Sequence, residues 1–356
     1  MRIYIQPSRE RGIALMMVLI VVTVLTILAG KFAYNMKVET KLARNASFEA
    51  DYEWAGRSGI ERAKWILALS ATGPGGQVDS LGAKWAGGSG DTNGALADVQ
   101  LKGFELGDNV TIDLEIEDHD RKFNINVADE VLLKEALTKV VGVEEGTLAE
   151  TIAQSILDWI DPDDKPRMSG AETSYDQNLT PPNFCKDGPM DDISELLMIQ
   201  GVTPAIYQGS GGGHMPTVHQ MNRGARQSRF EEVTYAVGLK DLFTTTSSRM
   251  VNMNTAPAEV LRIFPGIDEN IAQAIITARN GPDQIQGTQD DGIPNLNVVP
   301  GMPPGAAAQF SRFLSVRSLV FEVKVDVTAG GMKRRYIGLL RRNSPRDIQI
   351  LNMYWE

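Results

Sequence analysis

The chain has 356 residues, of which 42% are apolar and 22% are charged, and its formal net charge is −10. This length is sufficient for one large or two modest domains with a substantial core. A single cysteine, Cys185, excludes an internal disulfide framework and a cluster of metal-bound thiolates. The acidic balance argues against a general polyphosphate-binding protein. The charge is uneven, because residues 142–200 carry 13 acids and 3 bases whereas residues 311–346 carry 9 bases and 2 acids.

Residues 13–30 predict a membrane-spanning helix. These 18 residues contain no charge, and as a helix they would rise about 27 Å, close to the thickness of the bilayer hydrocarbon. A secretory signal would have a shorter apolar core followed by small residues at a cleavage site, whereas Lys31 and Phe32 follow here. The preceding leader carries three arginines, so we expect it to stay cytoplasmic while the rest of the chain lies across the membrane.

The helical pattern continues beyond the predicted span. From Lys31 to Leu69 the chain has no proline, and its apolar residues recur mostly every three or four positions. Gly56 and Gly59 weaken the pattern near its end, and the glycine-rich run 72–76 ends it. We therefore expect one long helix over residues 13–69, whose second half packs against another part of the protein.

The leader resembles that of type IV pilin and pseudopilin precursors. Residues 9–12, Arg-Glu-Arg-Gly, are followed directly by a long apolar helix. In that family a prepilin peptidase cleaves after the glycine and the new N-terminal residue is methylated, which by resemblance places the cut between Gly12 and Ile13. Most members have a glutamate at the fifth mature position, where this chain has Met17. The class that lacks this glutamate is the large minor pseudopilin K of type II secretion systems, which the chain resembles over almost its whole length.

The middle of the chain contains an internal repeat, which predicts two related supersecondary units at about 123–160 and 251–280. In the second unit, residues 264–268 have the proline and glycine typical of a turn between two helices. The matching segments are Phe123–Ala128 with Val251–Ala256, and Ile152–Ile156 with Ile271–Ile275.

The second turn resembles a helix-hairpin-helix motif, which in many proteins binds a DNA backbone. Such binding needs amides at a helix N-terminus that face a phosphate. Asp268 and Glu269 stand at this position in the second repeat, as do Glu144 and Glu145 in the first, and acids there cap a helix but repel phosphate. We interpret both repeats as packing modules, and a membrane-anchored DNA-binding protein that uses them is the alternative.

The segments on either side of the repeats predict strands. Residues 110–118 and 319–327 alternate apolar and polar side chains. The second segment is followed by a glycine turn and a basic strand at 333–340, as in a hairpin. Shorter strands are predicted at 122–125 and 233–237.

The predicted fold class is α+β. A long pilin-like N-terminal helix packs on a small antiparallel sheet, and a large helical domain built from the two helix-hairpin-helix-like modules is inserted into this unit. The expected divisions are a cleaved leader at 1–12, a transmembrane helix at 13–30, the pilin-like helix and first strands at 31–126, the inserted domain at 127–310 and the C-terminal strands at 311–356.

The acidic stretch contains the best candidate metal site. Several carboxylates follow one another at short spacing on a loop, which suits calcium because that ion takes six to eight oxygen ligands in flexible geometry. The spacing is not that of an EF-hand, and composition alone favours a solvated acidic loop. Two short elements, Asp161-x-Asp163 and Gly170-Ala171-Glu172, resemble sequences of the K family in a region where a relative binds calcium. This resemblance implies a calcium site. The candidate ligands are Asp161, Asp163 and Glu172, followed by Asp164, Asp176 and Asp187.

No zinc-protease, nucleophile-elbow or phosphate-loop motif is present in the sequence, so we expect no enzyme. The resemblance implies a minor pseudopilin at the tip of the type II secretion pseudopilus, which helps to initiate pseudopilus assembly and the export of folded proteins from the periplasm. It implies minor pseudopilins I and J, the prepilin peptidase and the inner-membrane secretion platform as partners, and no nucleic acid is expected. It also implies a single-pass inner-membrane protein with a cytoplasmic N-terminus and a periplasmic C-terminal domain.

Overall fold

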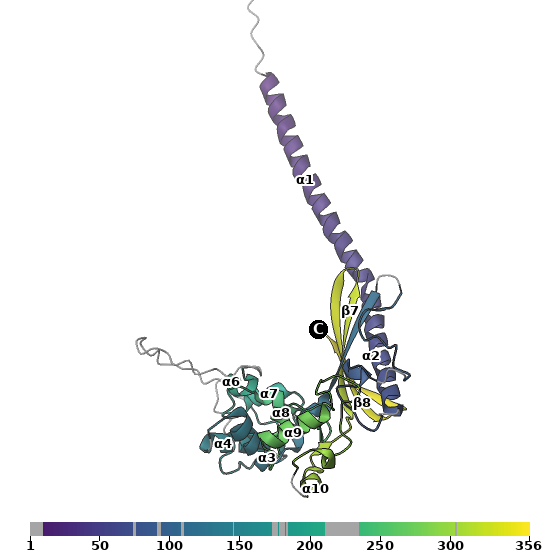
Figure 1. The fold of residues 1–356 in the computed structure, drawn as a ribbon. Coiled ribbons are helices and arrows are strands. Elements are labelled where there is room, and N and C mark those ends of the chain that lie inside the picture. The colour runs from purple at the N-terminus through teal and green to yellow at the C-terminus, as the bar shows by residue number, and fades with distance from the viewer. Residues whose placement is uncertain are drawn as a thin grey trace, which may run out of the picture.

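In the computed structural model the chain forms a helical stalk that leads to two lobes, one built on an antiparallel sheet and the other mostly helical (Figure 1). The structure describes residues 10–73, 76–90, 94–107, 110–144, 146–172, 177, 182, 184–210, 235–302 and 305–356. The α-helices are α1 (Glu10–Ser47), α2 (Glu49–Thr72), α3 (Glu130–Glu135), α4 (Thr147–Ile160), α6 (Pro204–Gln208), α7 (Leu239–Leu242), α8 (Ala258–Leu261), α9 (Glu269–Arg279) and α10 (Ala306–Phe310). The strands are β1 (Phe104–Glu105), β2 (Val110–Asp118), β3 (Phe123–Asn124), β4 (Phe243–Thr244), β5 (Val251–Asn252), β6 (Leu314–Ser315), β7 (Val320–Ala329), β8 (Met332–Ser344) and β9 (Asp347–Trp355).

Short helical turns of other types connect these elements. They are the 3-10 helices η1 (Lys84–Ala86), η2 (His119–Arg121), η3 (Ile125–Val127), η5 (Ile193–Met198) and η6 (Leu296–Val298), together with one π-helical turn, η4 (Ala136–Val141).

The stalk is two helices, which corrects the prediction of one unbroken helix over residues 13–69. α1 ends at Ser47, α2 begins at Glu49, and the aromatic ring of Phe48 between them lies over Gly330 in the turn between β7 and β8. The chain therefore bends where it first meets the sheet. Within residues 13–43 of α1 an 18-residue window has a mean hydropathy of 2.8, and none of residues 13–43 is buried, so α1 is long and apolar enough to cross a membrane.

α2 packs along one face of the sheet and ends at Thr72, the first residue of the glycine-rich run 72–76 that was predicted to end the helix. Gly56 and Gly59 do not end the helix. They lie on its buried face, where a Cβ atom at Gly56 would lie 2.6 Å from the ring of Tyr336, and one at Gly59 would lie 3.2 Å or less from three side-chain atoms of Val325. The two glycines therefore allow the helix backbone to approach the sheet closely.

The sheet has five antiparallel strands in the order β1-β2-β7-β8-β9. The predicted strand at 110–118 is confirmed as β2 with the same bounds, and the predicted hairpin is confirmed as β7 and β8. β2 pairs with β7 along its whole length, from Val110 opposite Ala329 to Asp118 opposite Phe321. Because β2 and β7 are neighbours, the intervening residues 119–319 leave the sheet at one point and return to the same point.

The short strands of the helical lobe lie outside this sheet. β3 pairs in parallel with β4, and β5 pairs in parallel with β6, so the predicted strand at 122–125 does not extend the main sheet. Of the predicted strand at 233–237, residues 233–234 lie outside the described residues and residues 235–237 are not a strand. Phe123 and Leu314 pack in the core of the helical lobe, whereas the expected divisions placed them with the sheet.

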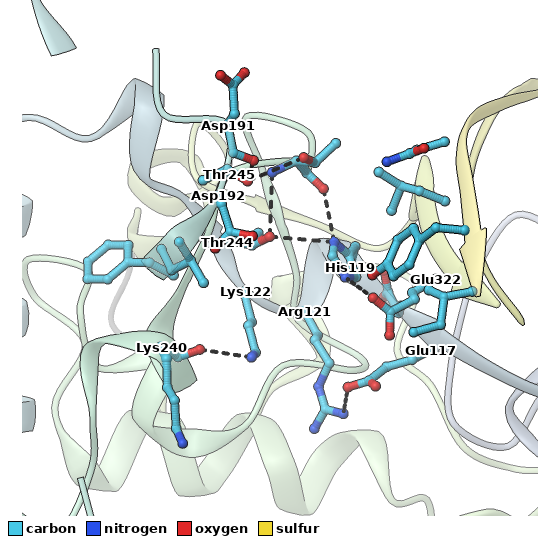
Figure 2. Close-up of a pocket in the computed structure, with 18 residues that line it drawn as sticks. Glu117, His119, Arg121, Lys122, Asp191, Asp192, Lys240, Thr244, Thr245 and Glu322 are labelled. Atoms are coloured by element: carbon cyan, nitrogen blue, oxygen red, sulfur yellow. Dashed lines mark hydrogen bonds and ion pairs between the residues drawn. The ribbon is translucent and has the colours of Figure 1, made fainter. Parts of the chain in front are cut away.

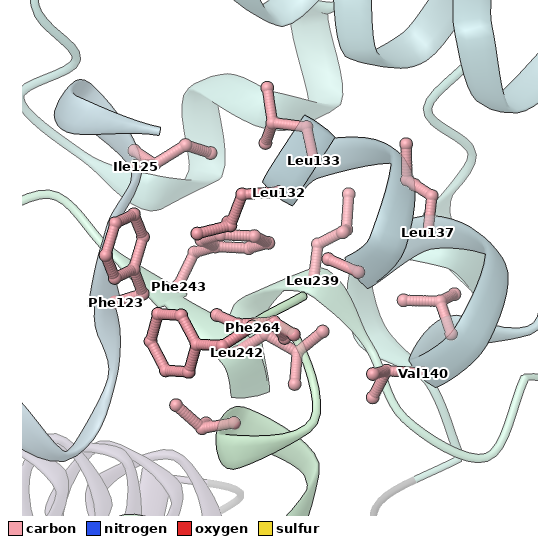
Figure 3. Close-up of a cluster of buried hydrophobic side chains, with 14 of the residues drawn as sticks. Phe123, Ile125, Leu132, Leu133, Leu137, Val140, Leu239, Leu242, Phe243 and Phe264 are labelled. Atoms are coloured by element: carbon pink, nitrogen blue, oxygen red, sulfur yellow. The ribbon is translucent and has the colours of Figure 1, made fainter. Parts of the chain in front are cut away.

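Side chains from both repeats form one continuous core in the helical lobe (Figure 3). The rings of Phe123 from the first repeat and Phe264 from the second meet edge to face with their centroids 5.6 Å apart. Leu132 and Leu239 are buried beside them. Neither repeat could bury its apolar face alone, so the two depend on each other for stability.

The Asn-x-Asn sequence has the same structural role in both repeats. The first asparagine accepts a hydrogen bond from the backbone N–H of the second, which shapes the turn. The second asparagine exchanges two hydrogen bonds with the backbone of a residue far along the chain. These pairs are Asn126 with Met190 at 2.7 and 3.0 Å, and Asn254 with Ile293 at 2.9 and 3.1 Å.

Candidate functional site

The predicted metal ligands do not all converge on one point. α4 ends at Ile160, and the acids that follow it diverge: Asp163 and Asp164 are exposed, and Asp163 accepts a hydrogen bond at 3.0 Å from the N–H of Lys165. Asp176 lies outside the described residues. The Asp-x-Asp spacing therefore places Asp161 and Asp163 in different environments.

Asp161 is half-buried and pairs with a cation that the sequence analysis did not consider. Arg167 Nη1 lies 2.6 Å from Asp161 Oδ2 and 2.5 Å from Asp158 Oδ1. Asp158 is fully buried, and a Cβ atom at Gly170 would overlap its carboxylate. Burial raises the pKa of Asp158, although hydrogen bonds from Arg167 partly offset this effect. One arginine thus compensates two of the acids in the acidic stretch.

Glu172, Cys185 and Asp187 form the tightest cluster of potential ligands among the described residues, with one ligand atom from each lying within 4.8 Å of the others. Glu172 is 1% exposed, and neither of its carboxylate oxygens has a hydrogen-bond partner among the described residues. Burial raises the pKa of Glu172 to about 7. Burial also raises the pKa of the Cys185 thiol to about 12, so that this sulfur is protonated at neutral pH.

The residues present fit a hard cation. A buried carboxylate without partners is costly unless it is protonated or binds a positive charge. Glu172 and Asp187 supply the oxygen donors that calcium prefers. Asp161 Oδ1 is also buried without a hydrogen-bond partner, and the charge of Asp161 raises the pKa of Glu172. The protonated thiol of Cys185 is a poor ligand for such an ion and borders the site.

A cleft of about 430 Å³ lies between the two lobes (Figure 2). His119 spans it from η2, with Nε2 3.3 Å from Glu322 Oε2 on the sheet and Nδ1 3.1 Å from the carbonyl oxygen of Thr246 in the helical lobe. Burial lowers the pKa of His119, but the hydrogen bonds to Glu322 and Thr246 outweigh burial and the net direction is upward. Both ring nitrogens face acceptors, so the doubly protonated imidazolium satisfies both contacts.

Two further cations of this cleft have polar partners close to His119. Arg121 Nη1 lies 3.1 Å from Glu117 Oε1, and Lys122 Nζ donates to the carbonyl oxygen of Lys240 at 2.9 Å (Figure 2). Burial lowers the pKa of Lys122. Of these residues, His119 joins the two lobes directly.

A fully buried group of hydrogen bonds beside this cleft also connects the two lobes, and we call it the buried joint. Asp118, at the end of β2, accepts hydrogen bonds from Ser318 Oγ at 2.5 Å, Thr255 Oγ1 at 2.5 Å and Asn252 Nδ2 at 3.2 Å. Burial, followed by the nearby charge of Asp120, raises the pKa of Asp118 to about 7. The first asparagine of the second repeat thus connects that repeat directly to the sheet.

Arg342 on β8 completes this joint. It is 3% exposed, forms an ion pair with Asp79, and donates hydrogen bonds to the carbonyl oxygens of Ser318 at 2.9 Å and Leu67 at 3.3 Å. A buried arginine with these partners ties α2, the sheet and the start of β7 together.

Comparison with known proteins shows a similarity to one family. A family model described as "Type II secretion system (T2SS), protein K" matches residues 121–209. A type II secretion system protein K from Pseudomonas aeruginosa is 22% identical over 356 residues, with 96% of this chain and 92% of the relative covered. The chain is therefore similar to the protein K family of type II secretion systems. A protein K from Escherichia coli strain K12 is 28% identical over 216 residues, covering 56% of this chain and 61% of that relative.

The fold is also similar to that of a solved K-family structure. A chain in the crystal structure of the GspK-GspI-GspJ complex from enterotoxigenic Escherichia coli aligns with a TM-score of 0.60 and 19% identity, covering 88% of this chain and 99% of that chain. The family model spans the first repeat and the acidic stretch, so every predicted ligand from Asp161 to Asp187 lies within it.

The alternative of a DNA-binding protein is not supported. At the start of α9, Asp268 accepts a hydrogen bond at 2.9 Å from the N–H of Ile271, and Glu269 pairs with Arg262 at 2.9 Å. Carboxylates therefore occupy the end of the helix where a phosphate would bind. The comparisons point to secretion proteins instead.

The sequence analysis did not identify the buried charged residues inside the fold. Asp158 lies in the predicted first repeat, Asp118 lies at the end of the predicted strand 110–118, and His119 directly follows that strand. A signal was available for the first of them, because Arg167 is one of three bases among the acids of residues 142–200 and Gly170 follows it closely.

Proposed function

We propose that this chain acts as a minor pseudopilin at the tip of a type II secretion pseudopilus, where it helps to initiate assembly and thereby supports the export of folded proteins. The observation that carries this proposal is the combination of K-family similarity with an uncovered apolar helix that leads into a small sheet. We also propose that residues between β2 and β7 form an inserted domain, whose bulk would hinder another subunit from stacking above it. The role is structural rather than catalytic.

The proposed location follows from α1. The apolar helix would anchor the chain once in the inner membrane, with the N-terminus in the cytoplasm and both lobes in the periplasm. A prepilin peptidase would cleave between Gly12 and Ile13, and the new N-terminus would be methylated. Mass spectrometry of the mature protein tests this proposal, because a chain that begins at any residue other than Ile13 would contradict it.

The proposed partners are minor pseudopilins I and J and the inner-membrane secretion platform. A related chain was solved in a complex with GspI and GspJ, and the present chain shares its fold. Co-purification of the full chain with pseudopilins I and J of the same system is the test, with an unrelated membrane-anchored periplasmic protein as the control. Failure to retain either pseudopilin above the control would reject the proposal.

We further propose that calcium binds at Glu172 and Asp187, close to Asp161. The ion would neutralise the buried Glu172 carboxylate and link the two ends of a loop that no disulfide can brace. Thermal unfolding of the full chain should occur at a higher temperature with calcium than with a chelator, and Glu172→Gln should remove this difference. Asp164→Asn, which changes an exposed acid of the same loop, should retain it. Equal melting temperatures for the wild type under both conditions would exclude the site.

A further inference from the structure

β9 is a long and exposed edge strand. It pairs with β8 on one side, and its other side has no neighbouring strand among the described residues. Four of its apolar side chains are 42–61% exposed, those of Ile350, Leu351, Tyr354 and Trp355. Residues 347–355 contain no lysine, arginine or proline, the residues that commonly protect a free edge from further pairing. The opposite edge strand, β1, is only two residues long.

A β-bulge divides this edge into two parts. The pairing with β8 skips Leu351, because Ile350 and Asn352 lie opposite consecutive residues of β8. A bulge is one of the devices that discourage pairing at an edge, so the first part of β9 is protected. From Asn352 to Trp355 the pairing with β8 is regular. The unprotected edge is therefore the part that follows the bulge.

The backbone of this second part offers hydrogen-bonding groups to solvent. The N–H of Glu356 donates to the carbonyl oxygen of Arg335 on β8 at 2.9 Å. Hydrogen-bonded and non-hydrogen-bonded pairs alternate along an antiparallel ladder. The N–H and C=O groups of Met353 and Trp355 therefore point away from β8. An incoming strand could pair with these groups without displacing any existing hydrogen bond.

The two faces of the free edge differ in character. Tyr354 and Asn352 line the cleft between the lobes. Trp355 lies on the opposite face, because successive side chains of a strand alternate. Its ring is 61% exposed, and the guanidinium of Arg334 lies 4.7 Å from its centroid. A strand added beside β9 would thus have one polar face in the cleft and one apolar face over Trp355.

The cleft side of this edge is acidic. Burial raises the pKa of the Tyr354 hydroxyl, and three nearby carboxylates raise it further, those of Glu322, Glu356 and Asp192. Glu322 and Asp192 line the cleft (Figure 2). Glu322 is paired with His119 at 3.3 Å, whereas Asp192 and Glu356 form no ion pair among the described residues. Negative charge beside Tyr354 is therefore left for a ligand to compensate.

We infer that residues 352–356 bind an extended segment of another protein, which adds a strand to the sheet and places lysine or arginine side chains beside Tyr354. Backbone pairing supplies affinity in this mode of recognition, and alternate side chains supply specificity. On the cleft face, a basic side chain would meet Asp192 and Glu356. On the other face, an apolar side chain would cover Trp355. The matching segment alternates basic and apolar residues.

The test measures binding of a synthetic peptide of alternating lysine and valine to the full chain in detergent micelles. Replacing the lysines with glutamate should raise the Kd at least about tenfold, because Asp192 and Glu356 would repel the peptide. N-methylation of alternate peptide nitrogens should also raise the Kd at least about tenfold, because it removes the backbone hydrogen bonds. Asp192→Asn keeps the cap of η5 but removes the charge, and should reduce the preference for lysine over glutamate about threefold.

Two substitutions of Trp355 separate the backbone contact from the side-chain contact. Trp355→Pro removes the outward N–H, whereas Trp355→Ala keeps it. Proline is tolerated on an edge strand where the nitrogen faces solvent, so the two free variants should have similar circular dichroism and melting temperatures. Trp355→Pro should bind the lysine peptide at least about threefold more weakly than Trp355→Ala. If the proline variant is unstable, the N-methylated peptide tests the same hydrogen bonds.

Several results would overturn the inference. Binding that N-methylation leaves unchanged would show that the peptide does not add a strand. Equal affinity for the lysine and glutamate peptides, or no measurable binding of the lysine peptide, would also overturn it. Self-association of the full chain that Trp355→Pro abolishes, without peptide binding, would assign the edge to a second copy instead. The proposed function does not depend on these results, because the mature N-terminus and co-purification test it separately.

Discussion

The close contact between α2 and the sheet gives a prediction whose magnitude follows from the geometry. In Gly59→Ala the new Cβ atom would lie 3.2 Å or less from three side-chain atoms of Val325, which is fully buried on β7. Ordinary contacts need roughly 3.5–4.0 Å, so the helix and strand must separate locally by about 1 Å. Overpacking of this kind costs up to about 3 kcal/mol, and alanine offsets about 1 kcal/mol through its helix propensity. The expected net loss is about 2 kcal/mol.

A double-mutant cycle isolates this contact. Val325→Ala alone should destabilise through a cavity, whereas Gly59→Ala with Val325→Ala should cost less than the sum of the single changes by about 2 kcal/mol, because each change relieves the other. The assay is urea unfolding of the full chain in detergent, followed by circular dichroism. Ser58→Ala, a more exposed position next to Gly59 on α2, is the control and should be nearly neutral. Additivity of the two changes within 0.5 kcal/mol would refute the packing argument.

Three further predictions concern the joints inside the fold. Because the pKa of His119 is raised in the folded protein, its contribution to stability is fully present below its unfolded pKa of about 6.5 and is lost as pH rises through its folded pKa. The loss of stability between pH 5.5 and pH 8.5 should therefore be smaller in His119→Gln than in the wild type. An identical pH profile for the two proteins would contradict this. Asn254→Ala leaves the buried N–H and C=O of Ile293 without partners, and should lower the free energy of unfolding by about 2–4 kcal/mol, whereas a loss below 0.5 kcal/mol would show that water replaces the amide. Arg167→Met removes the cation beside Asp158 but keeps the backbone N–H that also donates to it, and the Arg167 side chain is 36% exposed. The expected cost is therefore about 1.5–3 kcal/mol, much of which Asp158→Asn in the same chain should recover in thermal unfolding.

Local patterns were sufficient to predict the elements that neighbouring residues determine. The alternation of residues 110–118 predicted β2 with its exact bounds, and the glycine turn predicted the hairpin of β7 and β8. The bend at Phe48 could not be predicted, because it arises where that side chain meets Gly330, almost 300 residues later in the chain. Similarly, Gly56 suggested a weakened helix, whereas its role depends on a ring on β8.

The candidate site was predicted as a region but not as a set of ligands. Sequence spacing could identify an acidic loop, but it could not show that Glu172 and Asp187 converge while Asp163 points to solvent. Whether Glu172 and Asp187 approach each other depends on the path of the loop, and the ion pair between Arg167 and Asp158 helps to hold that path. The sequence could identify the repeated asparagines as a pair, but their backbone partners are 39 and 64 residues downstream.

The adjacency of β2 and β7 also constrains the order in which the protein can fold. The central strand pair joins residues 110–118 to residues 320–329, so the sheet cannot form until nearly the whole chain has been synthesised. Closing such a long loop is slow when the loop is unstructured, but a helical lobe that folds first would bring Asp118 and Phe321 close together. The helical lobe would then act as the nucleus that prepares the sheet, and until the last strands arrive the apolar face of α2 would remain exposed to solvent.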